Sequence, residues 1–436
     1  MGLVLKETVR LNDEIDYTEI IDTRYHLNAF KADFYMPFTK ENLYGMMFLT
    51  HLFPYGDPAC DTKRKETLWG MANYDPVIET ALNSAGDFLV LTLHCEWLDD
   101  ACVPDGESVT DEVLSHIRVL LFAPETDGKG YAIPEFEELR DILANNMEYE
   151  EYNPLSGINS RINRICFRGE PSETEYHIPS EEAREITPEA AYQMLQTMLR
   201  EAQIRIYATL AAENPAVLSW MQTQFGAISR RTSPLCFVRP SRIKEKPENV
   251  CEQFDDFTQS IVAVVYKYED APMRDIIYLC DLLDIGPESL LFQNLREKHS
   301  LCYSCGIDFE PEKHTVTVTC QTDREHIDEV IALIEDQIEI LRNGTYPEEL
   351  VSVIVKSSYM ERVALWDRFF GFGDYVRTQV PLGLEVRKDF AEYVKYTPCS
   401  RETVMQCAKQ LVLDTVYAAE GLAPADEEEE PDDDDA

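Results

Sequence analysis

The feature that most constrains the fold of this chain is an order of secondary-structure elements that occurs twice. In each half, hydrophobic periodicity predicts a strand, two helices, a second strand and a further helix. The offset between matching elements drifts only from about 229 to about 215 residues. The matching pairs are Phe30–Phe38 with Ser260–Tyr268, the helix ending at Leu52 with Pro272–Leu283, Asp61–Met71 with the helix carrying Arg296, Phe88–Glu96 with Thr315–Gln321, and Val109–Leu121 with Asp323–Arg342. This repetition predicts a duplicated α+β unit.

Length and composition agree with two tandem domains. A chain of 436 residues with 44% hydrophobic residues is too long for one ordinary core, but it can bury two cores of about 200 residues each. We expect an N-terminal domain over 1–228, a linker over 229–258, a C-terminal domain over 259–422, and a disordered acidic tail over 423–436. The last helix of the C-terminal domain is expected from about Ser400 to Ala418.

The expected linker is basic in an otherwise acidic chain. Its basic residues are Arg230, Arg231, Arg239, Arg242, Lys244 and Lys246. Nucleic-acid-binding segments usually interleave such residues with repeated aromatic ones, a pattern that this segment lacks. We therefore expect the linker to dock against the acidic domains of the same chain.

Charge and hydropathy exclude several classes of function. The formal net charge is −42, and nine of the negative charges lie between Asp426 and Asp435. Such a surface repels nucleic acid and anionic lipid, and it favours basic partners or simple solubility. The longest apolar runs fall far short of the ~18 residues of a membrane span, and the N-terminus has no signal-peptide apolar region. We expect a cytoplasmic protein whose 12 scattered cysteines are reduced.

The stretch from residue 288 to 304 places an arginine and a tyrosine close together in the sequence. Leu290, Leu291 and Leu295 form the apolar face of a predicted helix that carries Arg296 near its end, and Tyr303 opens a strand. A guanidinium and a phenolic hydroxyl are suited to hold a peptide carbonyl or an oxyanion. The alternative is a surface arginine at a helix end and a half-buried tyrosine without a function.

This stretch resembles a signature of the insulinase/pitrilysin family of zinc metallopeptidases, Leu-Phe-x-x-Leu-Arg-Glu-Lys-x-Gly-Leu-x-Tyr-Ser. The matching residues are Leu291, Phe292, Leu295, Arg296, Glu297, Lys298, Leu301, Tyr303 and Ser304. Ser300 departs from the pattern, because the family usually has glycine there. The resemblance implies that Arg296 and Tyr303 bind substrate. It also implies two domains, each a mostly antiparallel sheet covered by helices on one face, that together form half of a clam-shell.

The family's inverted zinc motif, His-x-x-Glu-His, is degenerate in this chain. In the family, the two histidines bind zinc and the glutamate is the general base. The motif aligns with Met47-Phe-Leu-Thr50-His51, so that Met47 replaces a ligand and Thr50 replaces the base. A thioether is a poor zinc ligand, and a hydroxyl cannot take a proton from water at neutral pH. We therefore expect no catalytic residues and no metal in this chain, with His51 at the edge of the core.

Other motifs carry little information about function. Cys302-Tyr-Ser-Cys305 is a lone CxxC, which is weak evidence for a zinc site or a redox pair and is more simply explained by core packing. Gly371-Phe-Gly373 does not extend to a dinucleotide-binding fingerprint.

Together these features predict a pseudoenzyme, the non-catalytic subunit of a heterodimeric zinc metallopeptidase. In such pairs, zinc is expected in the partner subunit, and this chain presents Arg296 and Tyr303 to a peptide substrate bound as an added strand. Similar bacterial pairs are associated with peptide maturation and with modification of elongation factor P. Two alternatives are open: a peptide-binding or scaffold protein without proteolysis, and a zinc hydrolase with unorthodox ligands around His51.

Overall fold

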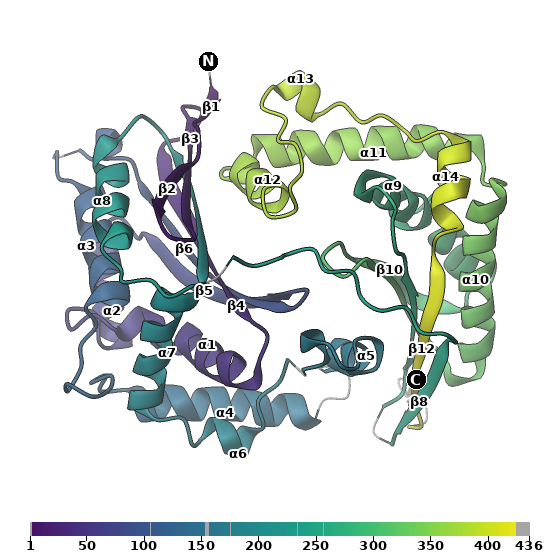
Figure 1. The fold of residues 1–436 in the computed structure, drawn as a ribbon, viewed down its shortest axis with the longest axis horizontal. Helices are drawn as coiled ribbons and strands as arrows, with labels where there is room; N and C mark the ends of the chain where they lie inside the picture. The colour runs from purple at the N-terminus through teal and green to yellow at the C-terminus, as the bar shows by residue number, and fades with distance from the viewer. Residues whose placement is uncertain are drawn as a thin grey trace, which may run out of the picture. The chain divides into compact units, whose positions relative to one another are not determined.

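The computed structural model describes residues 2–104, 106–152, 157–174, 176–232, 234–255 and 257–423. It contains two compact units. Unit 1 comprises Met1–Arg239 and Tyr359–Lys395, and unit 2 comprises the described parts of Pro240–Ser358 and Tyr396–Ala436. The expected acidic tail lies outside the described residues from residue 424 onward. The predicted α+β class is confirmed, with one sheet and its own helices in each unit (Figure 1).

The sheet of unit 1 is almost entirely antiparallel. Its seven strands run in the order β1-β3-β7-β4-β6-β5, with β2 paired to β3, and only β3 and β7 are parallel. The strands are β1 (Leu3–Leu5), β2 (Val9–Asn12), β3 (Ile15–Asp22), β4 (Leu27–Pro37), β5 (Val77–Ala85), β6 (Phe88–Leu98) and β7 (Gln203–Leu210).

One face of this sheet is apolar and packs against helices. Phe30 and Phe34 of β4 belong to the same buried core as Phe48, Ile117 and Leu195 from the helices. Side-chain hydroxyls of Thr39, Ser108 and Thr187 cap α1, α3 and α7 at their first turns. The helices of unit 1 before residue 239 are α1 (Lys40–Leu52), α2 (Lys63–Ala72), α3 (Val109–Phe122), α4 (Phe136–Tyr152), α5 (Ile158–Cys166), α6 (Ser180–Ala183), α7 (Pro188–Glu201) and α8 (Pro215–Gly226).

Unit 2 repeats this topology with five strands. Their order is β10-β11-β9-β12-β8, and again only one pair, β8 with β12, is parallel. The order β3-β7-β4-β6-β5 of unit 1 therefore corresponds strand by strand to β8-β12-β9-β11-β10, which supports the duplication predicted from the sequence. The strands are β8 (Glu248–Phe254), β9 (Ser260–Lys267), β10 (Cys302–Glu310), β11 (Thr315–Thr322) and β12 (Val412–Gly421).

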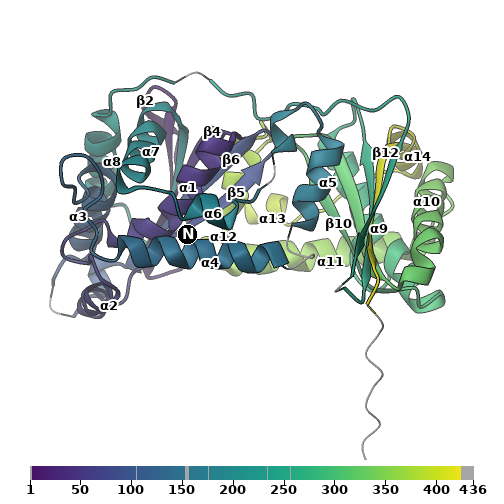
Figure 2. The same cartoon turned by 90° about the horizontal axis from the view of Figure 1, so that it is seen from below.

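Helices cover the apolar face of the unit 2 sheet. Figure 2 shows α10 and α14 on one side of its strands. Val264 and Val318 from the sheet share a buried core with Leu282 and Ile334 from the helices. The helices are α9 (Met273–Asp284), a π-helix (Phe292–Lys298), α10 (Ile327–Asn343), α14 (Arg401–Ala408), and α11 (Glu348–Asp367), which begins in unit 2 and ends in unit 1. Among the described residues, no helix is long and apolar enough to cross a membrane.

Three boundaries differ from those expected from the sequence. The expected linker contains β8, the counterpart of β3. The expected final helix ends at Ala408, and β12 follows it, because Val412–Gly421 pairs with two strands. Residues 359–395, which were assigned to the C-terminal domain, pack in unit 1. Each difference arises from pairing or packing with residues that are distant in the sequence.

The basic residues of the expected linker do contact their own units. The guanidinium of Arg230 donates to the carbonyl oxygens of Leu199 and Ala202, near the C-terminal end of α7. Arg239 lies 3.4 Å from Asp87, and Lys244 lies 3.6 Å from Asp414. These contacts agree with docking of the segment against the acidic chain itself.

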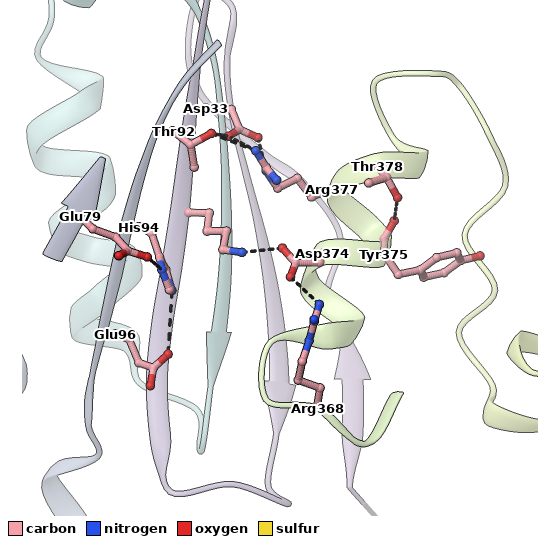
Figure 3. Close-up of polar contacts among 11 residues, drawn as sticks. Asp33, Glu79, Thr92, His94, Glu96, Arg368, Asp374, Tyr375, Arg377 and Thr378 are labelled. Atoms are coloured by element: carbon pink, nitrogen blue, oxygen red, sulfur yellow. Dashed lines mark hydrogen bonds and ion pairs between the residues drawn. The ribbon is translucent and has the colours of Figure 1, made fainter. Parts of the chain in front are cut away.

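Residues 359–395 pack against the second face of the unit 1 sheet, where a buried apolar cluster that includes Ile20, Tyr207 and Trp366 accompanies several ion pairs. Their helices are α12 (Gly371–Gln379) and α13 (Phe390–Tyr393). Arg377 of α12 makes a bidentate ion pair with Asp33 of β4, at 2.6 and 2.9 Å, and donates to Thr92 at 2.9 Å. Lys31 pairs with Asp374 at 2.6 Å on the same face. Figure 3 shows Arg377 pointing from α12 toward Asp33 and Thr92 of the sheet. The Asp33 carboxylate is fully buried, so its charge depends on Arg377.

We predict that Arg377→Ala destabilises unit 1 and loosens residues 359–395 from it. Removing one partner of a buried ion pair costs about 3 kcal/mol or more, because the other charge is left without compensation. A matched control is Arg368→Ala, which removes a side chain that is 62% exposed from its pair with Asp374. Loss of such an exposed pair costs less than about 1 kcal/mol. Thermal melting and limited proteolysis of both variants test this, and equal melting temperatures would contradict it.

Candidate substrate-binding site

The degenerate zinc motif lies on α1, where its side chains are engaged within the helix. Met47 is buried in the core of unit 1. The Thr50 hydroxyl donates to the carbonyl oxygen of Met47 at 2.7 Å, and Nδ1 of His51 lies 3.2 Å from the same oxygen. Burial lowers the pKa of His51. Where the motif has a zinc ligand, α1 therefore carries the core residue Met47. Where the motif has the base, α1 carries the Thr50 hydroxyl, which is hydrogen-bonded to the helix backbone.

No other arrangement in the described part of the chain replaces the lost motif. Among these residues, no group of three or more histidine, cysteine, aspartate or glutamate side chains is placed to hold a metal ion. Hydrolysis at a zinc site needs ligands for the ion and a base for the attacking water. Met47 is a core residue and Thr50 has a hydroxyl in place of a carboxylate.

Arg296 lies on the π-helix of unit 2, which is anchored by its apolar side. Leu291 and Leu295 are buried in the core, as the sequence predicted. Asn294 donates to Gln337 of α10 at 2.7 Å, which fixes the middle of the element. Arg296 itself is exposed, and its guanidinium lies over the ring of Phe292 at 5.0 Å. A well-anchored element therefore presents a cation to solvent.

The turn after this element tolerates serine where the related family has glycine. Ser300 has a φ of 54°, which is the left-handed region that glycine adopts without strain. A residue with a Cβ atom costs roughly 1–2 kcal/mol there. The backbone N–H groups of Ser300 and Leu301 donate to the carbonyl oxygens of Arg296 and Leu295, at 3.0 and 2.9 Å, and these bonds hold the turn. The departure at Ser300 therefore leaves the turn intact.

Tyr303 lies at a β-bulge in the edge strand β10. Cys302 pairs with Thr322 and Ser304 with Gln321, so that Tyr303 is the extra residue. Tyr303 is 56% exposed, which is more than the alternative interpretation of a half-buried tyrosine predicted. Its hydroxyl donates to Asp323 at 3.2 Å. The carboxylate of Asp323 raises the pKa of Tyr303, which keeps the phenol protonated and able to donate. The sequence analysis did not identify Asp323 as part of this site, because only the fold brings it beside Tyr303.

The two predicted substrate-binding residues therefore share unit 2 and are both accessible. The positive charge of Arg296 acts on the sulfur of Cys302, which precedes Tyr303. A guanidinium and a protonated phenol on one unit are both hydrogen-bond donors. Such donors suit a carbonyl or carboxylate group of a ligand.

Comparisons with known proteins agree with this arrangement. Residues 185–357 match the family model described as the peptidase M16 inactive domain. The probable inactive metalloprotease YmfF of Bacillus subtilis (strain 168) is 20% identical over 402 residues, which cover 89% of this chain and 92% of that protein. The crystal structure of a conserved protein from Enterococcus faecalis V583 superposes with a TM-score of 0.85 at 16% identity, covering 95% of this chain and 98% of that one.

A longer protease shares the fold. The ferredoxin protease FusC, solved as a mutant in complex with Arabidopsis ferredoxin, superposes with a TM-score of 0.64 at 14% identity. The match covers 94% of this chain and 44% of the FusC chain. The present chain thus spans less than half the length of this protease.

Over residues 185–357 the chain is similar to the peptidase M16 inactive domain, and over most of its length it is similar to a probable inactive metalloprotease. The solved structures show that it shares their fold.

The environment of His51 predicts a pH dependence of stability. Because burial lowers the pKa of this ring in the folded chain, the unfolded chain takes up the proton first as the pH falls. The stabilisation is present above the unfolded pKa of about 6.5 and is lost as the pH falls towards the folded value. As the pH is lowered from about 7.5 to 5, we expect the melting temperature of His51→Gln to fall less than that of the wild-type chain. Parallel pH profiles of the two proteins would contradict this.

Proposed function

We propose that this chain is the non-catalytic subunit of a heterodimeric zinc metallopeptidase. In this proposal, Arg296 and Tyr303 hold a substrate peptide whose scissile bond lies at a zinc ion on a sister chain. The observation that carries it is the contrast between the two motifs: Met47 and Thr50 are engaged within α1, whereas Arg296 and Tyr303 are exposed on a well-anchored surface.

The size of the chain supports a partner of similar fold. Because this chain matches less than half of FusC, a single FusC chain is long enough to hold two regions of this size. A separate chain with an intact His-x-x-Glu-His motif would supply the second half and the metal. FusC was solved with a protein, ferredoxin, bound to it, which supports a peptide or protein as the substrate.

The unit 2 sheet offers a place for an extended peptide. β10 is at the edge of the sheet, and within the described residues no strand pairs with its outer side. An extended peptide could add to this edge through main-chain hydrogen bonds. It would then pass the bulge at Tyr303, whose phenol would turn from Asp323 to donate to a peptide carbonyl together with the guanidinium of Arg296. The cytoplasmic location and the identity of the sister chain stay predictions from the sequence.

The first test of this proposal concerns metal. We expect the isolated chain to bind no stoichiometric zinc and to hydrolyse no peptide, because the motif on α1 retains one histidine and has lost its base. Elemental analysis of the purified chain and of its complex with the co-purified partner measures this. About one zinc per chain, lost in His51→Ala, would instead support the zinc hydrolase with unorthodox ligands.

The second test concerns Arg296 and Tyr303 directly. Loss of a charge-assisted hydrogen bond to a developing oxyanion costs about 3 kcal/mol, or roughly a hundredfold in rate. We expect Arg296→Ala and Tyr303→Phe to lower turnover of the reconstituted heterodimer to that extent, with little change in melting temperature. Both side chains are exposed, so neither loss opens a cavity.

Lys298→Ala is the matched control for this test, because Lys298 is an exposed cation on the same π-helix. It should leave turnover unchanged. Wild-type turnover in all three variants would remove the assigned role of the pair. Retained peptide binding in a complex that never hydrolyses peptide would favour the scaffold or peptide-binding alternative.

A further inference from the structure

Three cysteines of unit 2 meet on two neighbouring strands. Cys305 of β10 and Cys320 of β11 are directly opposite each other in the antiparallel register. Their sulfur atoms are 2.6 Å apart, closer than a van der Waals contact. Cys302 is hydrogen-bonded to Cys320 as well. All three are free thiols in the structure.

The bulge at Tyr303 is what brings these thiols together. In a regular strand, residues three apart point to opposite faces, so Cys302 and Cys305 would be separated by the sheet. The extra residue shifts the alternation by one, and both cysteines then face the same side as Cys320. Cys302 and Cys320 are buried in the unit 2 core, and Cys305 packs against that core with partial exposure. The same backbone irregularity therefore exposes Tyr303 and gathers the three sulfurs.

The surroundings of the three thiols differ in a way that suits thiol chemistry. The hydrogen bond from Cys320 and the nearby charge of Arg296 lower the pKa of Cys302, against the effect of its burial. Cys305 is the partly exposed member, within reach of a small solute. Thiolates, and not thiols, attack peroxides and disulfides. The contacts with Cys302 and Cys305, together with burial, raise the pKa of Cys320. The cluster thus combines an accessible sulfur with two buried sulfurs whose pKa values shift in opposite directions.

We propose that Cys305 and Cys320 form a reversible disulfide across β10 and β11 when the chain meets hydrogen peroxide or an organic peroxide. The Cys305 thiolate attacks one peroxide oxygen, the O–O bond breaks, and hydroxide or alkoxide leaves with the electron pair. The Cys320 sulfur then attacks the resulting sulfenic acid, an S–S bond forms, and water leaves with the thiol proton. The two thiols lose two electrons and the peroxide gains them. An external dithiol attacks the Cys305–Cys320 bond, leaves as its own disulfide and returns both cysteines to the thiol form.

Peptide mapping under non-reducing conditions tests this on the full-length protein. Cleavage after lysine and arginine places Cys302 and Cys305 in the peptide 299–313 and Cys320 in the peptide 314–324. We expect stoichiometric hydrogen peroxide to join these two peptides with the loss of two hydrogen atoms, and fragmentation between residues 302 and 305 to place the bond at Cys305. Dithiothreitol should separate the peptides again.

Two variants and one control complete the experiment. Cys302→Ser should still form the link, whereas Cys320→Ala should lose it. The control is Cys251→Ser, which removes an exposed cysteine of β8 and should behave as the wild-type chain does. Peptide mapping of the oxidised wild-type chain tests the proposal even if a variant fails to fold. Absence of the 299–313 to 314–324 link in the oxidised wild-type chain, a bond placed at Cys302, or a product that dithiothreitol does not reverse would each overturn the proposal.

Discussion

Both candidate sites depend on the alternation of side chains between the two faces of a strand. In β4 of unit 1 the alternation is unbroken: even positions such as Phe34 enter the core, and odd positions such as Asp33 face α12. In β10 of unit 2 it is broken at Tyr303. That extra residue turns the tyrosine outward and brings Cys302 to the face that carries Cys305 and Cys320. A regular strand would have neither feature.

The two motifs identified in the sequence have different surroundings for a physical reason. α1 packs between the sheet and other helices, so the residues at the zinc-motif positions must satisfy the core: Met47 fills volume, and the Thr50 hydroxyl donates to the backbone. Arg296 and Tyr303 are exposed and contribute little to burial. Their side chains are therefore available for the binding role proposed above.

The sequence predicted that one order of strands and helices occurs twice. The matching strand orders of the two sheets support this, and each sheet has one parallel pair of strands. It missed β8 and overextended the final helix into β12, because these two strands are specified by their mutual pairing and not by a strong period of their own. It placed residues 359–395 with the wrong domain. Their attachment combines a buried apolar cluster, which joins Trp366 to Ile20 and Tyr207, with the pairing of Arg377 and Asp33, which lie 344 residues apart in the chain.

The sequence by itself determined the α+β class, the resemblance at Arg296 and Tyr303, and the loss of the zinc motif at Met47 and Thr50, because periodicity and motif chemistry are local properties. The tertiary structure decided how those residues are used. Only strand pairing creates the bulge, exposes Tyr303 beside Asp323, and turns a lone CxxC into a cluster with Cys320 from another strand. These features depend on contacts between distant segments, which no local pattern encodes.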